Sequence, residues 1–258
     1  MKAFSDRYGP WAAIAGGSEG IGLAFAREAA VRGCKLVLLA HDQPSLDAAA
    51  AELSPTTEVV TVLGDLADDG AHRLIAACDG REVGLLIANA ASAPKGHFLD
   101  DPVEVHRRAI AINVDALVVL AHALGGPMRA RGRGGIVTMS SLSSLQGSAT
   151  FPTYAATKAF TRIFAEGLWA QSRRDGVDVT TIVAPAVDTP AFRSSQPRGG
   201  PRPVDAAIIA TAGLDGLGKR PVVFPTRQAH LTSALFARLL PRRAAIDVMA
   251  RITHRMYD

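Results

Sequence analysis

The chain has 258 residues, of which 48% are hydrophobic and 20% are charged, and its formal net charge is +4. This balance is ordinary for a soluble globular enzyme, and the length suits one large α/β core. The arginines at 129–133 and those beside Pro241 come without interleaved aromatic residues or a binding module. We therefore expect them to lie on a solvated surface, and we expect no nucleic-acid partner.

Cysteine content and hydropathy bear on the compartment. Cys34 and Cys78 form neither a disulfide framework nor a metal-ligand spacing, and we expect two buried thiols. The segment Met1–Gly9 has no apolar signal core, and charged or turn residues interrupt the apolar stretches before about 18 residues. The histidines also lack metal-ligand spacing. We expect a cytoplasmic protein with no transmembrane segment and no metal site.

Apolar runs typical of buried strands alternate with longer amphipathic segments typical of helices. The expected strands are Trp11–Ala15, Lys35–Ala40, Val59–Leu63, Gly84–Ala88, Gly135–Ser140, Val177–Val183 and Pro221–Pro225. The expected helices are Gly20–Arg32, Ser45–Leu53, Asp69–Cys78, Pro102–Arg131, Thr153–Arg174 and Val204–Gly216. This alternation predicts an α/β fold with a doubly wound, mostly parallel, seven-stranded sheet that has helices on both faces.

No repeat or Pro/Ser-rich linker interrupts this order, so we expect a single domain over residues 1–258. The segment 188–203 holds four prolines and two glycines and is expected to be a coil that serves as a substrate lid. In the tail, 229–258, an apolar helix is expected at Leu231–Leu240 and a basic one at Arg242–Arg255. We expect this tail to pack on the domain or on a partner subunit, and a membrane-surface helix is the alternative.

A glycine-rich turn follows the first expected strand and opens the first expected helix. Its residues are Gly16, Gly17, Ser18, Glu19, Gly20, Ile21 and Gly22. Glycines allow a tight turn and close backbone approach, and a helix N-terminus attracts a pyrophosphate. The turn therefore predicts a dinucleotide site, with a glycine turn that binds no ligand as the alternative.

Tyr154 and Lys158 stand four residues apart, and Ser141 lies 13 residues before Tyr154, directly after an apolar run. On a helix, Tyr154 and Lys158 would share one face. A nearby ammonium favours the phenolate, so we expect Lys158 to lower the pKa of Tyr154. Such a tyrosine can pass a proton to or from a carbonyl oxygen near neutral pH. A solvated helix face is the alternative for the pair taken alone.

These motifs together resemble the short-chain dehydrogenase/reductase family over about residues 8–226, in family order. The resemblance implies a Rossmann-type fold that binds NAD(P). Further matching segments are Asp65-Leu66 at the adenine, Asn89-Ala90-Ala91, the catalytic asparagine Asn113, and Val187-Asp188-Thr189 at the nicotinamide amide. Three positions depart from the usual pattern, namely Ala15, Ala91 and Ala184-Pro185.

The resemblance also implies a role for each catalytic residue. Tyr154 would exchange a proton with the carbonyl oxygen, and Ser141 would donate a hydrogen bond to the same oxygen. Lys158 would lower the tyrosine pKa and hold the nicotinamide ribose. Asn113 would hold a water molecule that links Lys158 to solvent.

Cofactor preference is expected to depend on the end of the second strand. An acidic residue there would bind both ribose hydroxyls and select NAD, but Ala40 occupies that position. His41 can hydrogen-bond a 2′-phosphate. Asp42 would repel that phosphate if it pointed inward, and helix-start chemistry is its other interpretation. We therefore expect NADP to be the preferred cofactor, with NAD as the alternative.

The expected substrate is a secondary alcohol or ketone on a bulky hydrophobic molecule. The ends Arg7–Trp11 and Met256–Asp258 resemble bacterial hydroxysteroid dehydrogenases. Apolar residues expected to form the pocket are Leu142, Leu145, Phe151, Pro190, Phe192 and Pro197. A reductase of 3-oxoacyl thioesters and a catalytically silent nucleotide-binding regulator are the alternatives. Surplus apolar residues on the two long helices, among them Phe160, Phe164 and Leu168, predict a homodimer or homotetramer.

Overall fold

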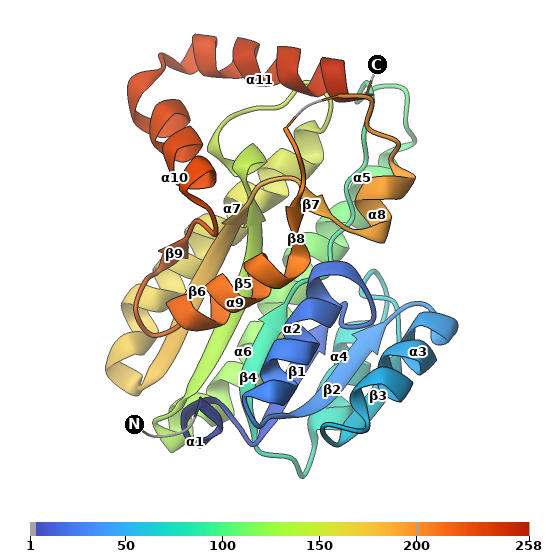
Figure 1. Cartoon of the computed structure of the whole chain (residues 1–258), viewed down its shortest axis with the longest axis vertical. Coiled ribbons are helices and arrows are strands. Elements are labelled where there is room, and N and C mark those ends of the chain that lie inside the picture. The colour runs from blue at the N-terminus through green and yellow to red at the C-terminus, as the bar shows by residue number, and fades with distance from the viewer. Residues whose placement is uncertain (1–3, 200, 258) are drawn as a thin grey trace.

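The computed structural model describes residues 4–199 and 201–257. A parallel seven-stranded sheet runs through it in the order β3-β2-β1-β4-β5-β6-β9 (Figure 1). Its strands are β1 Trp11–Ala15, β2 Lys35–Ala40, β3 Val59–Leu63, β4 Val83–Ala88, β5 Gly134–Ser141, β6 Val177–Ala184 and β9 Val222–Val223. The expected α/β fold class is confirmed, and the last strand is shorter than predicted.

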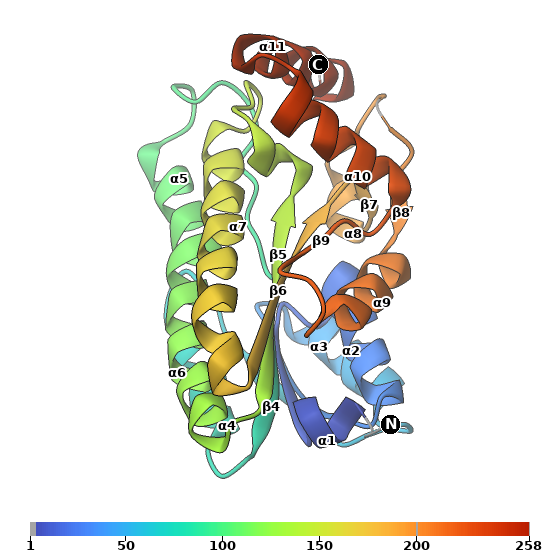
Figure 2. The same ribbon diagram turned by 90° about the vertical axis from the view of Figure 1, so that its left-hand side faces the viewer.

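Helices cover both faces of the sheet, as Figure 2 shows from the edge. One layer holds α2 Gly20–Val31, α3 Gln43–Leu53 and α9 Ala206–Gly216. The other holds α4 Gly70–Cys78, the long helix of α5 and α6, and α7 Pro152–Ser172, which a 3-10 turn at Arg173–Asp175 continues. A short helix, α1 Phe4–Tyr8, precedes the sheet.

Two hydrophobic cores lie on opposite faces of the sheet, because successive residues of a strand point to opposite sides. In β1, Ala12 and Ile14 pack into the core under α2 and α9. Trp11 and Ala13 pack into the core under α4 and α6. Burial on both faces explains why the central strands are continuous apolar runs.

The segment Pro102–Arg131, expected as one helix, is helical from Val103 but irregular inside. It consists of α5 Val103–Ile110, a π-helical turn at Ala111–Asp115 and α6 Ala116–Arg131. The run Val103–Arg131 contains an 18-residue window with a mean hydropathy of 1.7, and Asp115 interrupts its apolar residues. By length and composition it meets the criterion for a membrane span, but Leu120, Leu124 and Met128 of α6 pack into the core against the sheet.

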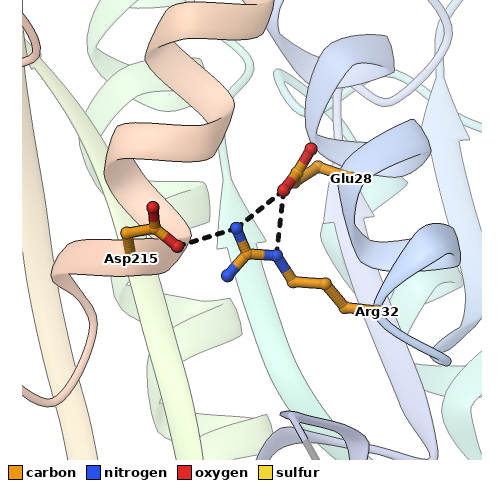
Figure 3. Close-up of polar contacts among 3 residues, drawn as sticks. All are labelled: Glu28, Arg32 and Asp215. Carbon is orange, nitrogen blue, oxygen red and sulfur yellow. Dashed lines mark hydrogen bonds and ion pairs between the residues drawn. The ribbon is translucent and has the colours of Figure 1, made fainter.

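Helices α2 and α9 pack closely against each other and are also linked by an ion pair (Figure 3). An added Cβ at Gly213 would lie 2.4 Å from Ile182 and 3.0 Å from Phe25, so a glycine is needed where α9 crosses α2. Arg32 lies 2.6 Å from Glu28 on its own helix and 2.8 Å from Asp215 on α9.

The segment expected to be a coil at 188–203 contains regular structure. A two-residue parallel pair joins β7 Val187–Asp188 to β8 Val204–Asp205, and α8 Pro190–Ser194 lies between them. Thr189 caps α8 by accepting a hydrogen bond from the Phe192 amide at 3.1 Å. Gly200, which belongs to the expected lid, lies outside the described residues, as do residues 1–3 and Asp258.

The tail contains the two expected helices, each with shifted ends. The first is α10 Arg227–Ala234, which continues as a π-helical turn at Leu235–Leu239. The second is α11 Arg242–Tyr257. Figure 2 shows α11 lying across the end of the molecule toward which β5 points.

Candidate active site

The glycine turn is held tightly against the ends of β2 and β4. The amides of Gly16 and Gly17 donate to the Leu39 carbonyl at 2.8 and 3.1 Å. Gly16 and Gly20 have φ of 77° and 53°, and a Cβ on Gly22 would lie 1.7 Å from the Gly16 carbonyl oxygen. Only glycine fits this path.

At the start of α2, the N-cap residue Glu19 makes no side-chain capping bond to the first amides of the helix. A helix N-terminus of this kind suits an anion such as a pyrophosphate. Among the other turn residues, Ser18 is buried and Ile21 packs against the core next to α2. The turn therefore fits the phosphate part of a dinucleotide.

Asn89 and Ala90 follow β4 and support the turn from the other side. Both amides donate to the Ala15 carbonyl, at 3.2 and 2.9 Å, and the Asn89 side chain donates to the Gly16 carbonyl at 2.9 Å. The Asn89 amide thus fixes the backbone of the turn.

The end of β2 places three polar side chains near the turn. Asp42 caps α3 by accepting from the Ser45 amide at 2.9 Å, which is the helix-start role considered from sequence. Ser45 Oγ lies 3.0 Å from Ser18 Oγ, so the start of α3 contacts the glycine turn. His41 is exposed at the strand end.

Asp65 and Leu66 follow β3, but Asp65 is already paired. Its carboxylate accepts from the Ala67 amide at 2.9 Å and from Arg108 at 2.5 Å. Partial burial opposes ionisation of Asp65, but these two donors outweigh it and lower its pKa. Leu66 packs in the core.

Asn113 lies inside the π-helical turn and connects three elements. Its amide oxygen accepts from the Ser92 backbone amide at 2.8 Å. Its amide nitrogen donates to the Ser92 carbonyl at 2.8 Å and to Thr157 Oγ1 at 2.9 Å. The side chain therefore has its partners within the protein and ties the loop after β4 to α7.

Ser141, Tyr154 and Lys158 meet where β5 ends beside the first turns of α7. Ser141 lies close enough to the Tyr154 side chain to act on its pKa, and Lys158 Nζ lies 5.6 Å from the centre of the Tyr154 ring. Lys158 Nζ donates to the Met139 carbonyl at 2.8 Å. Ser140 instead donates to the Lys158 carbonyl at 2.8 Å, which leaves Ser141 as the serine that faces Tyr154.

The expected lowering of the Tyr154 pKa by Lys158 is not found. Burial raises the pKa of Tyr154, the Ser141 side chain opposes this rise, and the nearby Tyr257 adds to it. Burial also lowers the pKa of Lys158 to about 8. Desolvation therefore dominates both shifts, and the Lys158 ammonium donates to the Met139 carbonyl.

A cavity of about 10 Å³ lies between Asn113 and Lys158. This volume is close to the minimum that one water molecule needs. Its other lining residues are mostly apolar and include Ala88, Leu117 and Met139.

Val187 and Thr189 lie beside the glycine turn. An added Cβ on Gly20 would lie 3.0 Å from Thr189 Cγ2, and Val187 is buried in the core next to α2. Thr189 therefore packs directly against the glycine turn, and Val187 supports this side of the sheet from the core.

The segment 188–203 and α11 are connected over this end of the sheet. The Arg198 amide donates to the Met256 carbonyl, and Lys95 donates to the Ser195 carbonyl, both at 2.9 Å. Lys95 also lies 5.1 Å from the centre of the Tyr257 ring. Sequence reasoning missed Lys95 as a connecting residue, since a single exposed lysine carries no motif.

Aromatic rings link α11 to the tyrosine on α7. Phe151 packs edge-on against Tyr154 and Tyr257, with ring centres 6.2 and 5.3 Å apart. Leu145, expected to line the pocket, instead packs in a small core with Phe236 and Met249. Among the described residues, no three His, Cys, Asp or Glu side chains gather as metal ligands.

A family model described as short chain dehydrogenase matches residues 10–199. Among curated proteins, the chain is 30% identical over 200 residues to a 7beta-hydroxysteroid dehydrogenase of Collinsella aerofaciens, which covers 76% of each chain. It is also 30% identical over 224 residues to a very-long-chain 3-oxoacyl-CoA reductase of Anas platyrhynchos, covering 82% of this chain and 72% of that one.

Two solved structures extend the similarity. One, from a study of 7beta-hydroxysteroid dehydrogenase stereoselectivity, has a TM-score of 0.90 and 25% identity over 96% of this chain and 99% of that one. The other is a short-chain dehydrogenase of Sphingobium yanoikuyae in complex with NADPH, with a TM-score of 0.79 and 30% identity over 89% and 93% of the two chains.

Proposed function

The chain belongs to the short-chain dehydrogenase family, and we propose that it interconverts a secondary alcohol and a ketone on a bulky hydrophobic molecule such as a hydroxysteroid. It is an oxidoreductase of this family, and similarity to an NADPH complex supports a nicotinamide cofactor. The observation that carries the reaction type is the junction of β5 and α7, where Ser141 contacts Tyr154 and Lys158 is buried one turn away.

In this proposal Tyr154 is the proton donor in reduction and the acceptor in oxidation. Ser141 donates a hydrogen bond to the same carbonyl oxygen as negative charge develops there. The nicotinamide cofactor supplies or accepts the hydride when it is bound. A catalytically silent regulator is disfavoured, since both Tyr154 and Lys158 are present and lie on adjacent turns of α7.

Lys158 and Asn113 support Tyr154 in different ways. Among the described residues, the Met139 carbonyl is the one hydrogen-bond partner of Lys158 Nζ, so its other protons are available to a ribose hydroxyl or a water molecule. A water in the cavity between Asn113 and Lys158 would extend a proton path from Lys158. Because the Asn113 side chain already has its partners, we assign it a positioning role.

The glycine turn is the proposed pyrophosphate site. The helix start without a side-chain cap and the close packing at Gly22 fit a dinucleotide phosphate. We further propose the segments at Asp65-Leu66 and Asn89-Ala90 as the walls around the adenosine, and Val187 with Thr189 as the wall at the nicotinamide end.

NADP is the proposed preferred cofactor. Asp42 is engaged as the cap of α3, while His41, Ser18 and Ser45 offer hydrogen bonds beside the position of Ala40. Ala40→Asp should shift preference toward NADH, because the carboxylate would repel a 2′-phosphate. The NADPH-to-NADH ratio of kcat/KM should fall about tenfold, the equivalent of one pKa unit of interaction. An unchanged ratio would show that this strand end does not face the ribose.

A bulky hydrophobic substrate is supported by the aromatic wall of Phe151 and Tyr257 beside Tyr154. The 3-oxoacyl thioester alternative keeps support from relatives of equal identity. Absorbance at 340 nm with a keto-steroid, a 3-oxoacyl thioester and both reduced cofactors tests the choice. We expect the highest kcat/KM with the keto-steroid and NADPH, and preferential turnover of the thioester would overturn the substrate assignment.

We also propose that residues 1–258 act as one domain, with 188–203 and the tail 229–258 closing over the substrate. A reducing, cytoplasmic setting is proposed because Cys34 and Cys78 are buried free thiols whose pKa burial raises to about 11.

A further inference from the structure

The segment 144–150, between Ser141 and Tyr154, gathers buried polar side chains that lack hydrogen-bond partners. Ser144, Gln146, Ser148 and Thr150 are 5%, 3%, 5% and 6% exposed. Their three hydroxyl oxygens and both amide atoms of Gln146 make up five of the ten such atoms found among the described residues. Buried polar groups are nearly always hydrogen-bonded, because an unpaired one costs about 1–3 kcal/mol. Such a concentration makes the segment a candidate for binding a polar ligand.

This segment lies between the proposed catalytic residues and the C-terminal helices. Leu145 packs against Phe236 and Met249, and its carbonyl accepts from Arg242 at 2.8 Å. The Thr150 carbonyl accepts from the Gly96 amide at 2.9 Å, next to Lys95 of the lid connection. The unpaired groups are therefore enclosed by the same elements that border Tyr154.

The chemistry of the segment points to an uncharged partner. Residues 142–151 contain serines, a threonine and a glutamine but no ionisable acid or base. A primary amide offers both a donor and an acceptor, which matches a hydroxyl group that is itself both. A charged group would stay without a counter-ion here.

We propose that Gln146, with its serine and threonine neighbours, forms a polar subsite that binds a hydroxyl group of the substrate away from the reacting carbonyl. This inference rests on the proposed function and adds a requirement to it. The preferred ketone carries a second, uncharged oxygen substituent on its hydrophobic skeleton. In the free protein the amide is buried and unpaired, and a substrate hydroxyl that reached it on binding would satisfy it.

The test compares the wild type with Gln146→Leu, which removes both polar atoms at similar volume. The substrates are a keto-steroid with a hydroxyl group on a distant ring and the same keto-steroid without it. The variant should lose about tenfold in kcat/KM for the hydroxylated ketone, because it lacks the amide that would bond the hydroxyl group. Its kcat/KM for the ketone without the hydroxyl group should change little. The free variant should also melt about 2–4 °C higher.

Thr181→Val is the matched control, since Thr181 Oγ1 is equally buried and unpaired but lies within β6. It should leave the ratio of the two substrates unchanged. A Gln146→Leu protein that melts lower, or that loses equally with both ketones, would show an amide with a structural role only, and would overturn the subsite.

A binding measurement separates this inference from the proposed function. If the wild type reduces neither ketone, the proposed function is wrong. Even then, a larger melting shift of the wild type with the hydroxylated steroid than with its counterpart, lost in Gln146→Leu, would support the subsite. Equal shifts, or none, would overturn it.

Discussion

At the scale of single residues, desolvation governs the candidate site. Lys158 is buried on α7, where its Nζ donates to the Met139 carbonyl, and burial lowers its pKa to about 8. Tyr154 is affected in the opposite sense, because burial penalises the phenolate. Desolvation therefore shifts the pKa of each group in the direction that favours its neutral form, and the positive charge of a bound cofactor or a change in hydration would alter that balance.

The Lys158 titration predicts a dependence of stability on pH. The folded-state pKa of about 8 lies below the ordinary value of 10.5. Between these values the unfolded chain binds more protons than the folded one, so the free energy of unfolding rises with pH. The stability of the wild type relative to Lys158→Met should increase by about 2 kcal/mol from about pH 7.5 to pH 10.

Urea denaturation without cofactor at the two pH values measures this difference. Lys35→Met, at an exposed ion pair with Glu58, serves as a control that should show no such increase. A wild-type advantage that is independent of pH would show that Lys158 titrates normally in the folded protein.

At the scale of elements, the π-helical turn between α5 and α6 connects this long helix to the candidate active site on α7. It holds Asn113 between the Ser92 backbone and Thr157, and Thr157 in turn donates to the Tyr154 carbonyl at 2.8 Å. Such turns are frequent at functional sites. Here the turn allows one amide to fix the loop after β4 and the start of α7 together.

Removal of this junction is testable. Asn113→Ala leaves the buried partners on Ser92 and Thr157 unpaired and should lower the free energy of unfolding by about 2–4 kcal/mol. It should lower kcat as well, since α7 loses its tie near Tyr154. Gln43→Ala, which removes an exposed amide bonded to Asp47, should change stability by about 0.5 kcal/mol or less. An equally small change in the free energy of unfolding for Asn113→Ala would show that this junction does not stabilise the protein.

The elements that could be predicted from sequence are those with one dominant signal. The first three strands were placed at their observed ends, since each is an apolar run between turn residues. The edge strand β9 and the small pair β7–β8 are only two residues long and depend on tertiary contacts. The π-helical turn was missed because its sequence keeps an ordinary helical pattern, and only contact with Ser92 reveals it.

Within the site, spacing predicted which residues meet but not how they interact. Ser141, Tyr154 and Lys158 lie close together at the end of β5, and the glycine turn packs against the ends of β2 and β4. The direction of the Tyr154 pKa shift was wrong, because burial and the orientation of Lys158 are not visible in a spacing. The pairing of Asp65 with Arg108 was likewise missed, since these residues are far apart in sequence.

At the scale of the whole molecule, the outer surfaces of α6 and α7 stay apolar. Phe160 and Ile163 are 38% and 58% exposed, and Val118 on α6 is 37% exposed. Phe160 stacks on Phe164, with ring centres 5.5 Å apart. Phe164 and Leu168, expected on this surface, pack partly into the core instead. We propose that this surface forms a homodimer or homotetramer contact.

Light scattering tests the assembly. We expect a mass of at least twice the 27.0 kDa of one chain, and a shift toward one chain in Phe160→Glu, because a buried charge without a partner is costly. Val31→Glu, at an apolar residue that is 78% exposed on α2, should leave the mass unchanged. A wild type that scatters as one chain would contradict the proposed interface.

The central claim is that Tyr154 exchanges the proton with the carbonyl oxygen, and Tyr154→Phe tests it most directly. The ring keeps its contact with Phe151, so the Kd for NADPH, followed by cofactor fluorescence, should stay close to that of the wild type. The kcat for ketone reduction should fall by about 10²–10⁴, the range typical of a general acid. Tyr8→Phe, which removes another partly buried hydroxyl, bonded to Asp178, should keep its kcat. A Tyr154→Phe enzyme that binds NADPH and retains most of the wild-type kcat would contradict the account.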